Sequence, residues 1–142
     1  MLAGHVSHDF ALVRLTSAGI VDAAFGSSGK VVTAVQTSNW DEAQGLALEA
    51  DGKIVVAGWA YEGNSSAGNF AVVRYQVDGQ LDTTFGGTGM VITPVAPGTG
   101  RDQGSAVLLQ TDDRIPAVRV LVAGQANTSS GASDFAVTRY WR

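Results

Sequence analysis

The sequence predicts an all-β protein, and two observations lead to this fold class. Glycine accounts for 18 of the 142 residues, and a glycine content this high favours many turns over long helices. The apolar runs are short, rich in β-branched residues and separated by polar or glycine-containing stretches, which is typical of β-strands. We therefore expect short antiparallel strands within one domain that covers residues 1–142.

An internal repeat organises this domain. The pattern Phe-Ala-x-x-Arg occurs in residues 9–15, 69–75 and 134–140, at intervals of about sixty residues. Repeat units bury their faces mainly against neighbouring copies, so the number of copies decides how much apolar surface is covered. The repeat divides the chain into a half unit over 1–28, a unit over 29–88 and a unit over 89–142.

Each full unit is predicted to contain four strands, which in the first unit cover 29–35, 43–49, 53–59 and 70–75. Asp51-Gly52 separates the second strand from the third. This dipeptide predicts a tight antiparallel hairpin in which both turn residues adopt positive φ.

The second unit departs from this pattern at the same hairpin. Asp112-Asp113-Arg114 takes the place of Asp51-Gly52-Lys53, and about five extra residues follow around Pro116. We expect a longer connection or a bulged strand at this point.

A glycine-rich segment with the pattern Asp-x-x-Phe-Gly follows the last strand of a unit, in residues 19–29 and again in 79–89. We interpret it as a crossing between sheets. Its aspartates can accept backbone N–H bonds in the turn, its phenylalanines can fill an apolar gap as a wedge, and its glycines permit left-handed backbone. The side chains in these roles are Asp22, Asp82, Phe25 and Phe85.

The stretches DGKIVVAG (51–58) and NFAVVRYQVDGQLDTTFGGTG (69–89), with their copies, resemble the delta-60 repeat family of bacterial proteins. The resemblance covers essentially the whole chain; it departs at Asp112-Asp113-Arg114 and at the start in mid-unit at Met1. It implies a β-propeller-type fold in which each four-stranded antiparallel unit is one blade. It implies no catalytic residues, because none are established for the family.

The predicted blades are two full blades plus a half blade per chain, and propellers typically close with about 4 to 8 blades. Left alone, such a chain exposes apolar blade faces and strand edges. We therefore expect a homo-oligomeric ring, either a dimer or a trimer, or a piece of a longer protein. Two chains of ten strands would give enough strands for five blades, whereas a trimer would contain six complete blades.

Composition excludes several partner classes. A formal net charge of -4 opposes attraction to nucleic acid or to an anionic membrane. The chain has no cysteine, no apolar run long enough to span a bilayer and no visible export signal. No cofactor is expected, because residues 24–30 resemble a phosphate-binding loop only superficially and lack its first glycine.

Three sets of side chains are candidates for a functional site. Two histidines spaced H-x-x-H could hold one metal ion if the loop bends suitably; otherwise they belong to a polar loop. Arginines that recur in every unit favour structural pairing, but in a central channel they could receive an anionic ligand. Two aromatic rings fall on the same side of an extended strand, and form either a surface platform or part of the core. The candidates are His5 and His8, Arg14, Arg74 and Arg139, and Trp59 and Tyr61.

These observations favour a non-catalytic module that serves as a scaffold or as a binding surface for a protein or glycan. Repetition without a unique polar cluster is the basis for this expectation. The alternative is a carbohydrate-active hydrolase or lyase with its site at the central channel of an assembled ring. Fold-level resemblance does not decide between them, because propellers host unrelated functions.

Overall fold

The computed structural model describes residues 1–36, 40–61, 67–96, 100–112, 115–127 and 130–141. In this part of the chain no helix is long and apolar enough to cross a membrane. The described residues form ten strands: β1 (Leu2–Val6), β2 (Asp9–Val13), β3 (Lys30–Thr33), β4 (Asp41–Leu48), β5 (Ile54–Tyr61), β6 (Gly68–Tyr75), β7 (Met90–Thr93), β8 (Gln103–Asp112), β9 (Ile115–Asn127) and β10 (Ser133–Trp141).

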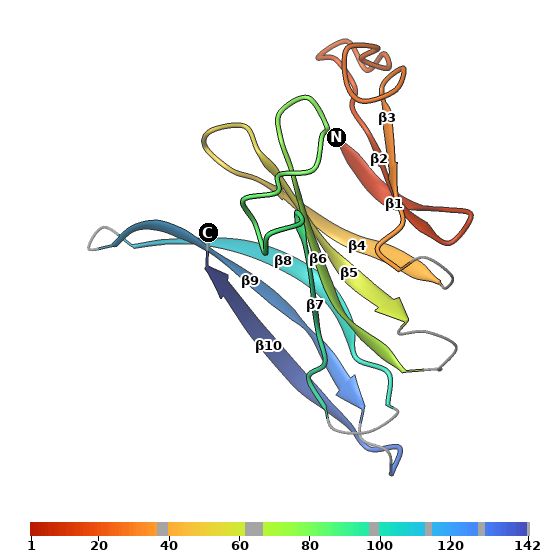
Figure 1. The fold of residues 1–142 in the computed structure, drawn as a ribbon, viewed down its shortest axis with the longest axis vertical. Coiled ribbons are helices and arrows are strands. Elements are labelled where there is room, and N and C mark those ends of the chain that lie inside the picture. Colours follow the sequence, from red (N-terminus) through yellow and green to blue (C-terminus); the bar gives the residue numbers. More distant parts are fainter. Residues whose placement is uncertain (37–39, 62–66, 97–99, 113–114, 128–129, 142) are drawn as a thin grey trace.

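The strands form three antiparallel sheets that lie side by side (Figure 1). The first sheet has the order β1-β2-β3, the central sheet β4-β5-β6-β7, and the third sheet β10-β9-β8. The edge strands β4 and β8 contact the neighbouring sheets. β4 packs against β1 and β2, and β8 packs against β4, β5 and β6. The all-β prediction is therefore confirmed.

The predicted count of two full blades plus a half blade is wrong. The described residues form one four-stranded sheet flanked by two three-stranded sheets. The strand that opens each sequence unit pairs with the last strand of the preceding unit, as β3 pairs with β2 and β7 with β6. A sheet is therefore displaced from its sequence unit by one strand.

The cause of this displacement is the segment between β6 and β7, which does not cross between sheets as predicted. A bridge joins Tyr75 to Leu81. The amide of Asp82 donates to the carbonyl of Arg74 at 2.9 Å, and the amide of Arg74 donates to the carbonyl of Gly89 at 2.8 Å. These bonds fold the segment back along β6, so that the following strand joins the same sheet.

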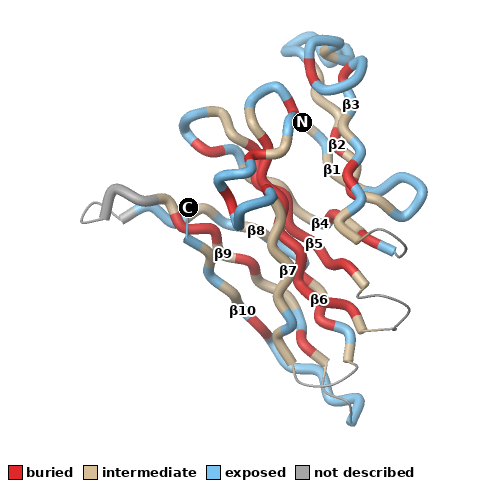
Figure 2. The backbone as a smooth tube through the Cα atoms, viewed as in Figure 1, coloured by how far each residue is buried: buried red, intermediate tan, exposed pale blue. Residues whose placement is uncertain are grey.

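The central sheet is buried on both faces, and its strands β5 and β6 are buried along nearly their whole length (Figure 2). On one face, Phe10 and Leu12 of the first sheet pack in one cluster with Val56 and Val73. On the other face, a second cluster joins the central sheet to the third; it contains Phe70, Val72, Val120 and Val122.

The third sheet packs closely on the central sheet because the backbones of β8 and β5 come near each other at Gly104 and Gly58. A Cβ atom on Gly104 would lie 2.6 Å from the carbonyl oxygen of Gly58. Glycine at this position therefore lets β8 approach β5. Bulges also recur at matching places, between Ala43 and Gly45 in β4 and between Gly104 and Ala106 in β8.

The hairpin at Asp51-Gly52 forms, but not with the predicted turn. Only Gly52 has positive φ, at 86°. The amide of Gly52 donates to the carbonyl of Glu49, and the amide of Glu49 donates to the carbonyl of Lys53, both at 2.9 Å. The loop is therefore a three-residue connection with glycine in the left-handed position.

Of the two alternatives expected for the altered hairpin of the second unit, the structure shows the bulged strand rather than a longer connection. β8 and β9 pair as far as Asp112 and Ile115, with an irregularity between Gln110 and Asp112. Asp113 and Arg114 themselves lie outside the described residues.

Candidate functional site

The first two repeated arginines each form the same three-part arrangement. Nε of Arg14 donates to Asp22 Oδ2 at 2.8 Å, and its guanidinium carbon lies 4.7 Å from the centre of the Phe25 ring. In the central sheet, Nε of Arg74 donates to Asp82 Oδ2 at 2.8 Å, and the Phe85 ring lies at 4.9 Å. The aspartate and phenylalanine predicted to hold the turn therefore also hold the arginine.

The arrangement around Arg74 is fully enclosed. The side chain is 1% exposed, and the carboxylate of Asp82 is buried beside it. Lys53 Nζ lies 3.1 Å from Asp82 Oδ2, and Glu49 Oε1 lies 3.8 Å from Arg74 Nη1. Burial works to raise the pKa of Asp82, but hydrogen bonds from Thr84 and Lys53 and the charge of Arg74 outweigh it and lower the pKa to about 2.

Arg14 also reaches across to the neighbouring sheet. Its Nη1 donates to the carbonyl of Val77 at 2.7 Å, and the amide of Gly26 donates to the carbonyl of Asp78 at 2.9 Å. Arg14 and Arg74 both bind partners within the chain. They hold the turns and the sheets together.

Arg139 differs from the other two. It is exposed on β10, and among the described residues no carboxylate takes the place of Asp22 or Asp82. Its guanidinium carbon lies 5.7 Å from the centre of the Trp141 ring, and Arg119 lies over the same ring at 4.6 Å.

The aromatic pair Trp59 and Tyr61 comes together as alternation along a strand requires, with ring centres 5.0 Å apart. Trp59 is only 7% exposed, so Tyr61 is the more accessible of the two rings. The guanidinium carbon of Arg101 lies 5.4 Å from the centre of the Tyr61 ring. The amide of Tyr61 donates to the carbonyl of Trp40 at 3.2 Å, and the exposed Trp40 ring packs edge-on against His8, with ring centres 4.2 Å apart.

His5 and His8 face different neighbours. The two residues Ser7 and His8 both have positive φ and form the tight turn between β1 and β2. Nδ1 of His5 lies 3.9 Å from Oε1 of Glu42, whereas the His8 ring lies on Trp40. In the described part of the chain, no three His, Cys, Asp or Glu side chains are grouped so that they could hold a metal ion.

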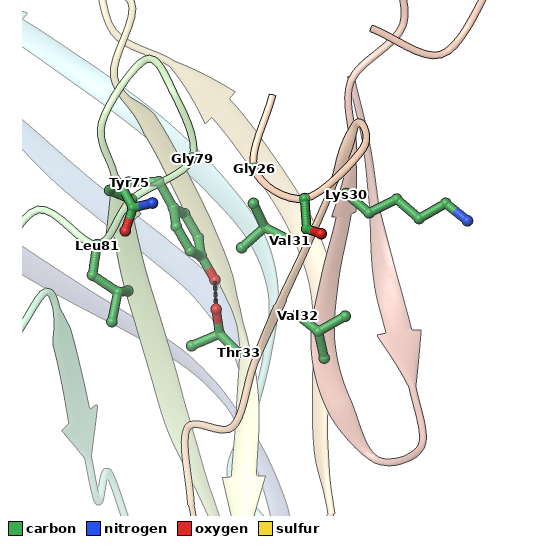
Figure 3. Close-up of a pocket in the computed structure, with 10 residues that line it drawn as sticks. Gly26, Lys30, Val31, Val32, Thr33, Tyr75, Gly79 and Leu81 are labelled. Atoms are coloured by element: carbon green, nitrogen blue, oxygen red, sulfur yellow. Dashed lines mark hydrogen bonds between the residues drawn. The ribbon is translucent and has the colours of Figure 1, made fainter. Parts of the chain in front are cut away.

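A cavity of about 500 Å³ opens between the first and central sheets. Figure 3 shows Tyr75 donating to Thr33 across it, at 2.8 Å, while Lys30 extends away from this pair. Burial raises the pKa of Tyr75 to about 12, although the bond to Thr33 works in the opposite direction. The ten residues that line the cavity include no Asp, Glu or His, so the cavity offers no carboxylate or imidazole for acid–base chemistry.

The bond between Tyr75 and Thr33 is one of two equivalent contacts that sequence reasoning missed. Tyr140 donates to Thr93 at 2.9 Å between the third and central sheets. The signal was present in the sequence, because Tyr75 and Tyr140 occupy the same repeat position, as do Thr33 and Thr93. Pairing these positions required knowledge of which sheets are adjacent.

Three stacked antiparallel sheets with an internal repeat are the architecture expected of β-propeller blades. The comparison with protein families agrees with this class: residues 49–85 match the model of a family described as a β-propeller domain of unknown function, DUF5122. This match supports a β-propeller repeat family. Searches among curated proteins and among solved structures gave no match.

Proposed function

We propose that this chain is a non-catalytic β-propeller repeat module that serves as a scaffold by associating with a second copy of itself. The observation that supports the proposal is the pairing of two kinds of sheet face. We call the face that carries Phe10 and Leu12, Phe70 and Val72, or Phe135 and Val137 the Phe face. The opposite face, which carries Ala11 and Val13, Ala71 and Val73, or Ala136 and Thr138, is the Ala face.

Within the chain, a Phe face packs on an Ala face twice. The Phe face of the first sheet meets the Ala face of the central sheet. The Phe face of the central sheet then meets the third sheet. Among the residues that the structure describes, nothing covers the Ala face of the first sheet or the Phe face of the third sheet.

Both open faces expose apolar side chains. On the third sheet, Phe135 is 80% exposed and Val137 is 51% exposed. On the first sheet, Leu2 and Val32 are exposed. A second copy presents the complementary face to each, so the contact is head-to-tail, and such heterologous contacts generate rings when the rotation closes.

The number of sheets favours a dimer. Two chains supply six sheets, within the range of about 4 to 8 blades at which propellers close, whereas three chains would supply nine. The dimer is therefore the form that we expect in solution, and the trimer is its competitor.

Light scattering coupled to size exclusion tests the proposal. We expect twice the 14.6 kDa mass of one chain. Val137→Asp should yield monomer, because it places a charge in the contact. Leu48→Asp is the matched control, since Leu48 is 55% exposed but lies on the central sheet, and it should leave the dimer intact. A monodisperse monomer in the unaltered chain would overturn the proposal.

The binding role that we propose for this scaffold rests on the loop end of the sheets, where Tyr61, Arg101, His8 and Trp40 lie. Exposed aromatic rings can stack on sugars or anchor a protein. A glycan array and a panel of glycoside substrates should be run with the unaltered chain and with Trp40→Ala. Binding that weakens in the variant, without turnover, supports the module; turnover would favour the carbohydrate-active hydrolase or lyase instead.

A further inference from the structure

Asp41, at the start of β4, joins the central sheet to the first sheet. Its Oδ2 accepts hydrogen bonds from the amides of Val35 and Gln36, which follow β3, both at 2.8 Å. Its own amide donates to the carbonyl of His8, in the turn between β1 and β2, at 2.7 Å. The side chain of Asp41 is 0% exposed. A buried carboxylate therefore holds β4 against two segments of the first sheet.

Asp102 makes the same bonds one sheet further along the chain. Its Oδ2 accepts from the amides of Val95 and Ala96, at 2.7 and 2.9 Å. Its amide donates to the carbonyl of Gly68, in the central sheet, at 2.7 Å. The two aspartates occupy the same repeat position, so any difference between them comes from their neighbours.

The second carboxylate oxygen distinguishes the two aspartates. Asp102 Oδ1 accepts from the amide of Asn127 at 3.2 Å. Asp41 Oδ1 is buried and, among the described residues, has no hydrogen-bond partner. Tyr61 takes the place of Asn127 in the central sheet, but its amide donates to the carbonyl of Trp40 instead. An ionised oxygen in this position is costly, because it has lost its water without gaining a donor.

The charge beside each aspartate also differs. The residue after the bonded carbonyl is Asp9 in the first sheet and the neutral Asn69 in the central sheet. The charge of Asp9 acts on Asp41, and in the described part of the chain neither carboxylate forms an ion pair with lysine or arginine. The other titratable groups around the start of β4 contact neighbours of their own, namely His8 on the Trp40 ring, His5 beside Glu42, and Arg101 over the Tyr61 ring.

We propose that Asp41 is a proton-binding site at the contact between the first and central sheets, and that this contact tightens as the medium becomes acidic. A proton from solvent binds the unbonded Oδ1 and turns the carboxylate into a neutral carboxyl group. Oδ2 keeps its bonds to the amides of Val35 and Gln36, and the like charge facing Asp9 is removed. The contact held by Asp102 should not respond in this way, because its Oδ1 already accepts a hydrogen bond.

The electrostatics of the site support this assignment. Burial raises the pKa of Asp41 above its ordinary value of 3.8, and the charge of Asp9 adds to the increase, although the amide bonds of Gln36 and Val35 act in the opposite direction. Because the folded pKa is the higher one, the folded chain binds this proton more tightly than the unfolded chain. The stabilisation is therefore present in acid and is lost as the pH rises through the folded pKa, opposite to the behaviour of Asp82.

Carboxyl carbon NMR of the unaltered chain measures the protonation directly. The carboxyl group of Asp41 should titrate with a midpoint above 3.8. Asp9→Asn, which copies the neutral Asn69 of the next sheet, should lower that midpoint. A midpoint at or below 3.8 in the unaltered chain would overturn the proposal, and a midpoint that Asp9→Asn leaves unchanged would overturn the part assigned to Asp9.

Amide hydrogen exchange tests whether the contact tightens. After correction for the intrinsic exchange rate at each pH, the protection factors of Val35 and Gln36 should rise by about threefold or more between about pH 7 and pH 4. The amides of Val95 and Ala96 are the internal control, and their protection should not rise. Equal changes at both contacts, or no change at Val35 and Gln36, would contradict the tightening.

The same substitution at the two aspartates should have opposite effects. Asp41→Asn keeps an oxygen for the two amides and replaces the unbonded charged oxygen with a neutral group, so the melting temperature at pH 7 should rise. This gain should shrink toward about pH 4, where Asp41 is itself protonated. Asp102→Asn turns a donor toward the amide of Asn127, and should lower the melting temperature by about 4 °C. A decrease for both variants, or a gain independent of pH, would refute the proposal.

Discussion

Replacing Asp82 by asparagine tests the buried ion pair between the end of β6 and the turn that follows it. Asp82 receives Arg74 Nε at 2.8 Å, Lys53 Nζ at 3.1 Å and the Thr84 hydroxyl at 2.7 Å. The substitution removes the carboxylate bonded to Nε of the buried Arg74, and removing one partner of a buried pair costs about 3 to 5 kcal/mol. We expect a loss of unfolding free energy of this size at pH 7, measured by urea denaturation.

The pH dependence of stability gives a second, independent value for the contribution of Asp82 to the free energy of unfolding. The pKa of Asp82 is lowered from 3.8 to about 2 in the folded chain, and a difference of about two pKa units corresponds to about 2 to 3 kcal/mol. Because the folded pKa is the lower one, this stability is present above pH 4 and is lost as the pH falls toward 2. Asp82→Asn should lack this acid-dependent loss.

The first sheet offers a matched control for this substitution. Asp22 makes the same 2.8 Å contact with Arg14, but the two side chains are 29% and 24% exposed. Solvent screens such a pair, so Asp22→Asn should cost about 1 kcal/mol or less. Equal losses for the two variants, or an unchanged acid profile in Asp82→Asn, would refute the reasoning.

The other predictions concern packing, backbone and alkaline stability. Phe85→Ala should cost about 3 to 5 kcal/mol in denaturant unfolding because Phe85 is 2% exposed; Phe135→Ala, at an exposed position, is the control, and a near-wild-type Phe85→Ala would argue against the wedge. Gly52→Val should lower the free energy of unfolding by about 1 to 2 kcal/mol, because Gly52 has a φ of 86°. Asp51→Val should lower it by less. Equal losses for the two variants would indicate a turn in which both residues are left-handed. The pKa of Tyr75 is raised to about 12 in the folded chain, so the free energy of unfolding should fall by about 2 to 3 kcal/mol as the pH rises from 10 toward 12. Tyr75→Phe should remove this part of the loss. An unchanged alkaline profile in the variant would show that Tyr75 is not its source.

The sequence was sufficient to predict the strands, because each is a short apolar run bounded by turn residues. It was not sufficient to predict which strand joins which sheet. That choice depends on the bonds of Arg74 to Asp82 and Gly89, which fold a segment back instead of letting it cross. Such pairing over a long connection leaves no local signature.

The sequence was sufficient to predict which residues form the candidate sites, but not how deeply each side chain is buried or which partners it contacts. Repetition of Arg14, Arg74 and Arg139 indicated a structural role, and the structure gives the first two their aspartates. Alternation along β5 placed Trp59 beside Tyr61, but burial of Trp59 depends on neighbouring sheets that no strand pattern specifies. The turn at Ser7 and His8 had no glycine to mark its positive φ.

The position of Leu15 provides a final test of the head-to-tail dimer. Leu15 corresponds to Tyr75 and Tyr140, whose hydroxyls donate to Thr33 and Thr93 on the outer strand of the preceding sheet. In the proposed dimer Leu15 faces the third sheet of the partner, where the described residues place no outer strand beside β10, so an apolar side chain suits this place.

Leu15→Tyr should therefore bring a hydroxyl into the contact without an acceptor, and the dimer should dissociate about tenfold more readily. Sedimentation over a range of concentrations measures this change, with Leu48→Tyr on the central sheet as the control. The unfolding free energy of the monomer should stay the same, because the Ala face of the first sheet is open in a single chain. If Leu15→Tyr leaves the dimer unaffected, the contact between the two copies lies elsewhere. The two sheet contacts described within the chain both involve this repeat position, through Tyr75 and Tyr140.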